Sequence, residues 1–280
     1  MKKYRIICCL LYSLFAVFLF TSCKNTNEPL DTLDLFFLKT HSQSDCIVLQ
    51  TGSHAVIIDT GELSDSRQLA EFLRERNIEV IPYLILSYPN EHYTDSALSV
   101  LNEFRVENVI MPFYSGPNEN YEVIMNVLKE KRISLHRPLK RRYFNFFRLG
   151  LMVYPPRELY YSEDNNYSLA VLGNYGKTRM LFAGDGTGKR IRELMDMEWT
   201  GIDLLKIPYH GRAGRSSADF VMKQKARYGV IFAGKGDSRI TETLAAAGTR
   251  AFYTREGDLH FIANGLELLP ADEVNNEKKR

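Results

Sequence analysis

The strongest constraint on this 280-residue chain is a repeated alternation of apolar runs of strand length with segments of helical periodicity. In the first half, apolar runs at 46–50 and 54–59 precede helical patterns at 64–77 and 95–104. The second half repeats this order, and no linker-like stretch separates the halves. Two facing sheets with helices outside satisfy such a pattern better than a single parallel sheet. The sequence therefore predicts an α/β chain folded as one αββα sandwich from 33 to 270, with two mixed sheets and helices on both outer faces.

The N-terminus carries the pattern of an export signal. Basic residues precede the run 6–20, which contains no charge and is about as long as a signal-peptide core but short for a spanning helix. The run ends in FTSC, and Cys23 resembles the lipidated cysteine of bacterial lipoproteins, although Phe20 stands where Leu is usual. An uncleaved N-terminal anchor is the alternative. We expect residues 1–22 to be a lipoprotein signal peptide.

The lipoprotein resemblance implies a location in the bacterial cell envelope. Lys24 follows the cysteine where Asp would signal inner-membrane retention, so we expect a lipid-anchored protein on the periplasmic side, at the outer membrane. The membrane, through this lipid, is the first expected partner. Residues 23–32 are polar and predict a tether, and 271–280 predict a polar tail. Cys46 is the cysteine left in the mature domain, so no intrachain disulfide can form and we expect a buried, inert thiol.

Composition and motifs exclude several classes of function. The net charge of +2 gives no general attraction to nucleic acid or to an acidic membrane, and no Gly-x-Ser-x-Gly elbow or Cys–His pair indicates covalent hydrolysis. The basic and aromatic run 140–148 suits single-stranded nucleic acid, but strand alternation explains it better, with Phe144 and Phe146 on one face. GDGTGK at 184–189 lacks the spacing of a phosphate loop. Three isolated histidines are expected to be structural: His54, His136 and His260.

Five segments in order resemble the metallo-β-lactamase-like domain of the ComEC competence family. They are HSQSDCIVL (41–49), VIIDTG (56–61), SYPNEHYTDS (87–96), NNYSLAVLGNYGKTRMLFAGD (165–185) and DLLKIPYHG (203–211). Together they span nearly the whole mature chain. The family clusters His and carboxylate ligands of two metal ions on strand-end loops, with a metal-bound water as nucleophile. The resemblance implies the αββα fold and a metal-dependent hydrolase of phosphodiesters, with nucleic acid as a possible partner.

The segment SYPNEHYTDS lacks most ligands of the family's main metal motif. Aligned without a gap, Tyr88 replaces the first His, Asn90 the second ligand, His92 the Asp and Tyr93 the final His. A one-residue gap would instead place His92 on the final His and delete the Asp. Both alignments leave at most one good ligand in this loop. The glycine pair that follows the motif is also lost, since Asp95 begins its place.

The second half of the chain keeps two candidate ligands. Asp185 stands at the position of the family's metal-bridging carboxylate, and His210 remains from a histidine pair whose first member is Tyr209. Which histidine of that pair binds metal stays open. We also place Asp59, from VIIDTG, at the pocket. The candidate ligands are Asp185, His210, His92 and, weakly, Asn90, which are few even for one metal ion.

Three of the lost histidines are tyrosines: Tyr88, Tyr93 and Tyr209. A phenol is a poor zinc ligand at neutral pH because its pKa is about 10, but its hydroxyl can fill an emptied polar pocket. Two interpretations stay open, a remodelled pocket that binds a ligand and a dead site filled by packing. We predict a lipid-anchored, non-catalytic binding or assembly protein with an unassigned small-molecule or protein ligand. The alternative is a phosphodiesterase-like hydrolase with a reduced site, and zinc or manganese would be its cofactor.

Overall fold

The structure is a computed structural model of the chain, and the fold is described from Thr32 onward. The description covers residues 32–88, 91–114, 119–214 and 216–277, with the backbone but not the side chains given for 91–95, 119–121 and 277. The predictions on residues 1–31, which include the signal peptide and Cys23, lie outside the described residues. No helix in the described part is long and apolar enough to cross a bilayer.

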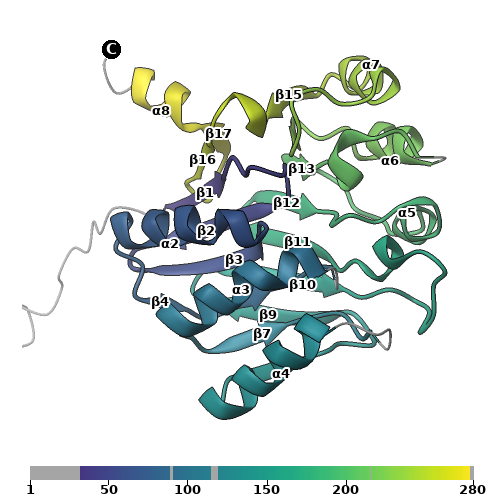
Figure 1. Cartoon of the computed structure of the whole chain (residues 1–280). Coiled ribbons are helices and arrows are strands. Elements are labelled where there is room, and N and C mark those ends of the chain that lie inside the picture. The colour runs from purple at the N-terminus through teal and green to yellow at the C-terminus, as the bar shows by residue number, and fades with distance from the viewer. Residues whose placement is uncertain (1–31, 89–90, 115–118, 215, 278–280) are drawn as a thin grey trace, which may run out of the picture. The chain divides into compact units, whose positions relative to one another are not determined.

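Two mixed sheets form the centre of the domain (Figure 1). The first has ten strands in the order β17-β16-β1-β2-β3-β5-β7-β8, and β4 pairs with β3 and β6. Its strands are β1 Leu33–Phe37, β2 Cys46–Thr51, β3 His54–Thr60, β4 Val80–Ile81, β5 Leu84–Ile85, β6 Arg105–Val106, β7 Asn108–Ile110, β8 Ser134–His136, β16 Leu259–Ala263 and β17 Leu268–Pro270. The second has seven strands in the order β15-β14-β13-β12-β11-β10-β9. Its strands are β9 Arg142–Phe146, β10 Leu149–Tyr154, β11 Ala170–Tyr175, β12 Thr178–Phe182, β13 Leu204–Lys206, β14 Tyr228–Ile231 and β15 Arg250–Tyr253.

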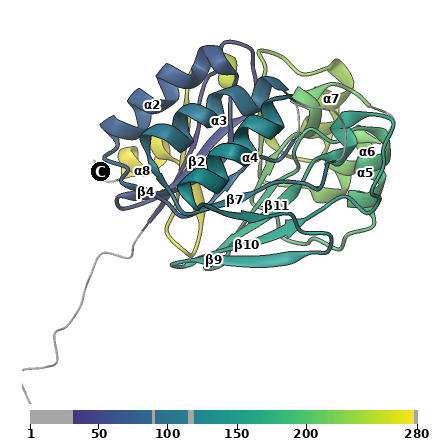
Figure 2. The same ribbon diagram turned by 60° about the horizontal axis from the view of Figure 1, so that its bottom comes forward.

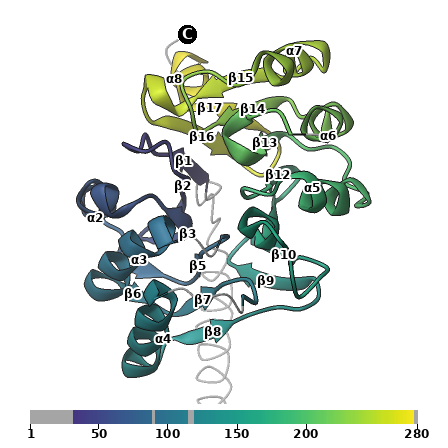
Figure 3. The same ribbon diagram turned by 45° about the vertical axis from the view of Figure 1, so that its right-hand side comes forward.

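Helices cover the outer face of each sheet. The first sheet carries α2 Ser66–Glu75, α3 Glu91–Glu103 and α4 Glu119–Lys131, which lie side by side in Figure 2. The second carries α5 Gly188–Met195, α6 Ser217–Gln224 and α7 Ser238–Ala246. Figure 3 shows the two sheets between these two helical layers. The remaining elements are α8 Ala271–Glu277 and the 3-10 helices η1 Leu63–Asp65, η2 Asp164–Tyr167, η3 Pro208–Gly211 and η4 Thr254–Glu256. The predicted αββα architecture is confirmed.

Three apolar clusters hold the four layers together. The cluster between the sheets includes Phe37 and Phe261, whose ring centroids lie 6.0 Å apart in an edge-to-face arrangement. A second cluster packs the first sheet against α2 to α4, and a third packs the second sheet against α5 to α7. Because β2 lies between two clusters, all of its side chains are buried. A strand buried on both faces has a nearly continuous apolar sequence, which is what CIVL shows.

The strand pairings give the sandwich two ends. At one end, which we call the site end, β3 and β12 finish and β2 begins. At the other end, which we call the base, four turns meet, and they lie at 51–54, 146–149, 175–178 and 263–268. Lys177 N donates to Gly265 O at 2.8 Å, and the rings of His54 and Phe147 have centroids 5.5 Å apart. Turns from both sheets therefore meet at the base.

Two local predictions can be compared with the structure. The run 140–148 contains β9, which pairs with β10 and buries Phe144, as the amphipathic-strand interpretation predicts. The helix expected at 95–104 begins earlier, at Glu91, so the polar segment after β5 supplies its first turn. The sequence gives no helical periodicity there, because Glu91 to Ser96 contains no aliphatic residue.

The three isolated histidines make structural contacts. His260 Nε2 lies 2.6 Å from Asp34 Oδ1, and its ring stacks on Phe36. His136 Nε2 lies 3.0 Å from Asn108 Oδ1, and His54 packs beside the aromatic residues of the β9–β10 turn. Cys46 is buried, as expected, since the residue is 1% exposed.

Candidate functional site

A polar cavity of about 420 Å³ opens at the site end of the sandwich. Its walls come from the loop before β2, the end of β5, η2, the end of β12, η3 and the loop after β14. Among the predicted site residues, Tyr88, Asp185, Tyr209 and His210 line it. These residues lie close together because each follows the end of a strand at the same edge of the sandwich. Loops at strand ends commonly hold binding and catalytic residues.

Lys206 is the centre of the buried charge cluster beneath this cavity. Its ammonium donates to Asp185 Oδ1 at 3.0 Å, to Gly184 O at 3.0 Å, and to Asp45 Oδ2. An ammonium has three protons to donate, so these three acceptors satisfy it fully. The side chains of Lys206, Asp45 and Asp185 are 1%, 4% and 5% exposed. Solvent screening is therefore weak, and the charges of the three groups interact strongly.

The pKa directions in the cluster follow from burial and from these contacts. Burial opposes charge on Lys206, but the two carboxylates raise its pKa above the ordinary value. Burial also opposes ionisation of Asp185, yet Lys206 and His210 hold its pKa well below its usual range. Burial raises the pKa of Asp45 to about 6 against the pull of Lys206. Burial lowers the pKa of His210, whereas the hydrogen bond to Asp185 raises it. On balance, the pKa of His210 lies above its ordinary value.

His210 extends the cluster to the cavity surface, because its Nε2 lies 3.0 Å from Asp185 Oδ2. The backbone of η3 places it there in an unusual conformation. Tyr209 and His210 have φ values of 50° and 52°, and Gly211 follows at 71°. Left-handed backbone is costly for residues with a Cβ and is concentrated at functional sites. A Cβ on Gly211 would lie 3.1 Å from Ile231 Cγ2 and 3.3 Å from Gly236 Cα, so the turn also requires glycine.

Asp45, Asp185 and His210 are the described residues whose ligand atoms lie close enough, within 4.8 Å of one another, to hold a metal ion. Two carboxylates and an imidazole are a suitable donor set for zinc or manganese, and Asp45 Oδ1 is buried with no hydrogen-bond partner in the described part of the chain. The Lys206 ammonium, however, already contacts both carboxylates. A divalent ion at these oxygens would face a fixed positive charge in a low-dielectric setting. The described residues therefore fit a metal poorly while Lys206 is charged.

The two described tyrosines differ in their surroundings. Tyr88 is 6% exposed, and its hydroxyl donates to Asn165 Oδ1 at 3.4 Å, so its ring fills the cavity wall. Tyr209 is half-buried, and the guanidinium of Arg212 lies 5.3 Å from the centroid of its ring. Arg212 and Lys235 are both exposed at the cavity rim. The cavity thus combines a buried phenol, a half-buried phenol and two cations that solvent can reach.

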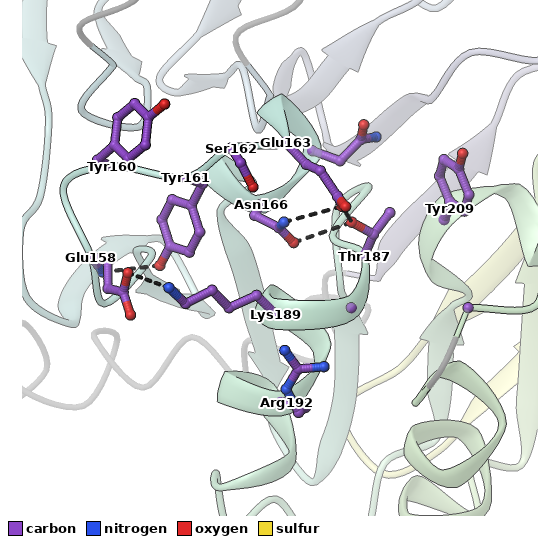
Figure 4. Close-up of a pocket in the computed structure, with 13 residues that line it drawn as sticks. Glu158, Tyr160, Tyr161, Ser162, Glu163, Asn166, Thr187, Lys189, Arg192 and Tyr209 are labelled. Carbon is purple, nitrogen blue, oxygen red and sulfur yellow. Dashed lines mark hydrogen bonds and ion pairs between the residues drawn. The ribbon is translucent and has the colours of Figure 1, made fainter.

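A larger groove of about 890 Å³ continues from the cavity, with Asn165 and Tyr209 lining both. Figure 4 shows its floor, where Thr187 Oγ1 lies 2.7 Å from Glu163 Oε2 and 3.2 Å from Asn166 Oδ1. Beside this floor, Lys189 pairs with Glu158 (Figure 4), and Arg192 is exposed. The groove and the cavity together give a continuous polar surface that can accept an extended ligand.

The wall of this groove is held from beneath by a buried arginine. Arg190 is 0% exposed and donates to Ser168 O at 2.8 Å, to Glu193 Oε2 at 2.8 Å and to Tyr154 O at 2.6 Å. Burial lowers its pKa from the ordinary value, and Glu193 opposes that shift. A buried arginine whose nitrogens all have hydrogen-bond partners is a structural element of the groove wall.

The remaining predicted site residues fall into two groups. Asp59 is buried beneath the cavity, where Oδ1 accepts from Ser87 N at 2.7 Å and Oδ2 accepts from Ser87 Oγ at 2.6 Å. Burial, together with Asp45, raises the pKa of Asp59 to about 7. The predictions on Asn90 and Cys23 lie outside the described residues. So do those on three side chains in the first turns of α3: His92, Tyr93 and Asp95.

Sequence reasoning missed the two residues that complete the charge cluster, Asp45 and Lys206. A signal for Lys206 was present, because a lysine inside the apolar run IDLLKIPY must be buried and a buried lysine needs an acidic partner. Asp45 directly precedes the buried strand β2, but nothing in the sequence indicates that it meets Lys206. That pairing depends on how the two sheets face each other.

A curated protein and two solved structures resemble this chain. ComE operon protein 3 of Bacillus subtilis is 24% identical over 255 residues, which cover 82% of this chain and 31% of that protein. The chain thus spans about a third of the length of this relative. No family model matches the sequence.

The structural matches agree with the fold. The metallo-β-lactamase fold protein YhfI of Bacillus subtilis superposes with a TM-score of 0.56 and 10% identity, over 83% of this chain and 99% of YhfI. A variant of the CmlA β-hydroxylase of Streptomyces venezuelae superposes with a TM-score of 0.54 and 12% identity, over 83% of this chain and 54% of CmlA. At these identities the matches show the fold alone. The chain has the metallo-β-lactamase fold and is distantly homologous to ComE operon protein 3.

Proposed function

We propose that this protein is a lipid-anchored, non-catalytic binding protein that keeps the metallo-β-lactamase fold without its metal chemistry. One observation carries the proposal. The two buried carboxylates at the site end, Asp45 and Asp185, share the ammonium of Lys206 as a common ion-pair partner. A site whose carboxylates already have a cation is stable without metal, because their desolvation is offset within the protein. Tyr88 and Tyr209, which stand at two lost ligand positions and line the cavity, also support the proposal, because a phenol is a poor zinc ligand at neutral pH.

The cavity and the adjoining groove are the proposed binding surface. Ligand pockets of a few hundred Å³ usually carry a small number of polar groups that fix orientation, and here the rim offers Arg212 and Lys235. Asn165 and Tyr209 lie where the cavity joins the groove. A polar ligand that spans both would contact Tyr209, so Tyr209→Ala should weaken its binding without loss of the fold.

The alternative is a phosphodiesterase-like hydrolase with a reduced metal site. The triad of Asp45, Asp185 and His210, with its buried and unpartnered Asp45 oxygen among the described residues, is the observation that favours it. Such an enzyme would have to displace Lys206 or lower its charge before binding a divalent ion. The two functions therefore make opposite predictions about metal content.

Metal analysis of the purified full chain tests the proposal. We expect substoichiometric zinc and manganese, no hydrolysis of a generic phosphodiester, and a melting temperature that a chelator leaves unchanged. Metal that stabilises a folded protein adds about 3 kcal/mol at one hundred times its Kd, so its removal from a true holo-protein would be obvious. Stoichiometric metal that is lost in Asp185→Asn would establish the hydrolase instead.

The location is part of the same proposal and has its own test. Replacing the lipidated residue, Cys23→Ser, should release the domain from the membrane fraction or leave the precursor uncleaved. Membrane association with normal processing in this variant would contradict lipidation at Cys23.

A further inference from the structure

The base of the sandwich, opposite the cavity, combines exposed apolar and basic side chains. Phe147, at the tip of the β9–β10 turn, is 61% exposed, and Leu266, in the β16–β17 turn, is 66% exposed. Arg148 and Lys177 are exposed beside them and form no ion pair with any described residue. The base therefore presents apolar tips beside two exposed cations, with Glu267 exposed next to Leu266.

The four turns are held together as one surface. The guanidinium of Arg148 lies 5.3 Å from the ring centroid of Tyr175, and Lys177 N donates to Gly265 O at 2.8 Å. Phe147 packs against His54 of the β2–β3 turn. Contacts of this kind fix the relative positions of the turn tips. The exposed side chains consequently belong to one rigid end of the domain, and they are not independent loops.

The polypeptide enters the domain at this same end. Thr32 precedes Leu33, which pairs with Ala263 at the start of the β16–β17 turn. Nine residues separate Cys23 from the start of β1, and a fully extended chain of that length reaches at most roughly 30 Å. A lipid on Cys23 would thus hold the start of β1 within roughly that distance of the bilayer surface.

We propose that the base is a membrane-facing surface that rests on a bilayer with anionic headgroups. Aromatic and aliphatic side chains partition into the interface, and basic residues add electrostatic attraction to acidic lipid. This inference rests on the proposed lipid anchor and adds an orientation to it. Because the cavity lies at the other end of the strands, docking of the base would direct the ligand-binding surface away from the membrane.

Thiol accessibility in proteoliposomes tests this orientation on the processed full chain. Leu266→Cys places a reporter at the base, and Leu63→Cys, at a position 64% exposed at the site end, is its matched control. Cys46 gives little background because burial raises the pKa of its thiol well above its ordinary value. The proteins are reconstituted in phosphatidylethanolamine vesicles with and without phosphatidylglycerol and treated with a membrane-impermeant maleimide.

We expect the thiol at 266 to react about ten-fold more slowly in vesicles than in detergent, while the thiol at 63 reacts equally in both. Protection should weaken without phosphatidylglycerol and in Arg148→Gln/Lys177→Gln, since each cation near an anionic surface is worth about five-fold in partitioning. Equal reactivity at 266 in vesicles and detergent, with the chain still bound to vesicles, would overturn the docking surface but leave the anchor intact. Failure to co-sediment with vesicles would overturn both. Greater protection at 63 than at 266 would show the opposite orientation.

Discussion

Replacing Lys206 by methionine tests the central feature of the site. The change keeps most of the buried side-chain volume and removes the charge that Asp45 and Asp185 share. Removing one partner from a buried ion pair costs about 3–5 kcal/mol, because an uncompensated charge is left in the interior. We expect Lys206→Met to lower the free energy of unfolding by that amount at pH 8.

The loss should depend on pH in a definite direction. Without Lys206, the folded-state pKa of Asp45, already raised to about 6 in the wild type, rises further above its ordinary value of 3.8. A folded state that binds the proton more tightly is fully stabilised below the unfolded pKa and loses that stability as pH rises through the folded pKa. The destabilisation of Lys206→Met should therefore be largest at pH 8 and shrink towards pH 5.

Urea unfolding at both pH values, followed by circular dichroism, measures these changes. Lys235→Met is the matched control, since Lys235 is exposed at the same cavity and its loss should change stability by less than about 0.5 kcal/mol. Lys206→Met should also bind zinc more tightly, because the ammonium no longer occupies the space beside Asp45, Asp185 and His210. If Lys206→Met is as stable as the control variant at pH 8, the ion pairs of Lys206 with Asp45 and Asp185 do not stabilise the fold.

Three further predictions concern neighbouring residues. Tyr88→Ala should destabilise by about 2–4 kcal/mol in thermal unfolding because the ring is 6% exposed; a change below 1 kcal/mol would mean that the cavity wall collapses freely. Asp59 has its pKa raised from 3.8 to about 7, so its contribution to stability is lost as pH rises through 7. In urea unfolding, the free energy of unfolding of Asp59→Asn relative to that of the wild type should rise by about 2–4 kcal/mol between pH 4 and pH 8. A difference between the two proteins that stays constant with pH would contradict the pKa shift of Asp59. Restoring the family's ligands should raise zinc affinity in calorimetry, and a folded variant that binds no zinc would contradict the alignment. The changes are Tyr88→His, Asn90→Asp, His92→Asp, Tyr93→His and Tyr209→His.

The fold was predictable because most of its strands and helices have a recognisable hydrophobic periodicity in the sequence. Strands such as β2 are buried throughout and appear as unbroken apolar runs, and α2 places Leu69 and Leu73 on one face. The two-residue strands β4 and β6 are too short to carry any period, and only their pairing partners define them. The early start of α3 was not predictable for a similar reason, since the sequence from Glu91 to Ser96 has no aliphatic residue to reveal a helical period.

The site was predictable only in part, because its contacts join distant segments. Asp185, Tyr209 and His210 could be placed at one edge from their position after strands. The ammonium of Lys206 meets Asp45 because β13 and β2 belong to different sheets that face each other. No local pattern encodes that meeting. Asp59 was predicted at the pocket, and its buried side chain accepts hydrogen bonds from Ser87 N and Ser87 Oγ.

Charge balance that includes His210 extends the argument for a metal-free site. The carboxylates of Asp45 and Asp185 carry two negative charges, and Lys206 with a protonated His210 carries two positive ones. The raised pKa of His210 keeps its proton to higher pH than the ordinary 6.5. A zinc ion needs a neutral imidazole, so binding here must release that proton and place the ion beside Lys206. Zinc affinity at this cluster should therefore fall steeply as pH falls. A wild-type protein that takes up zinc equally at pH 6 and pH 8 would bind it somewhere else in the chain.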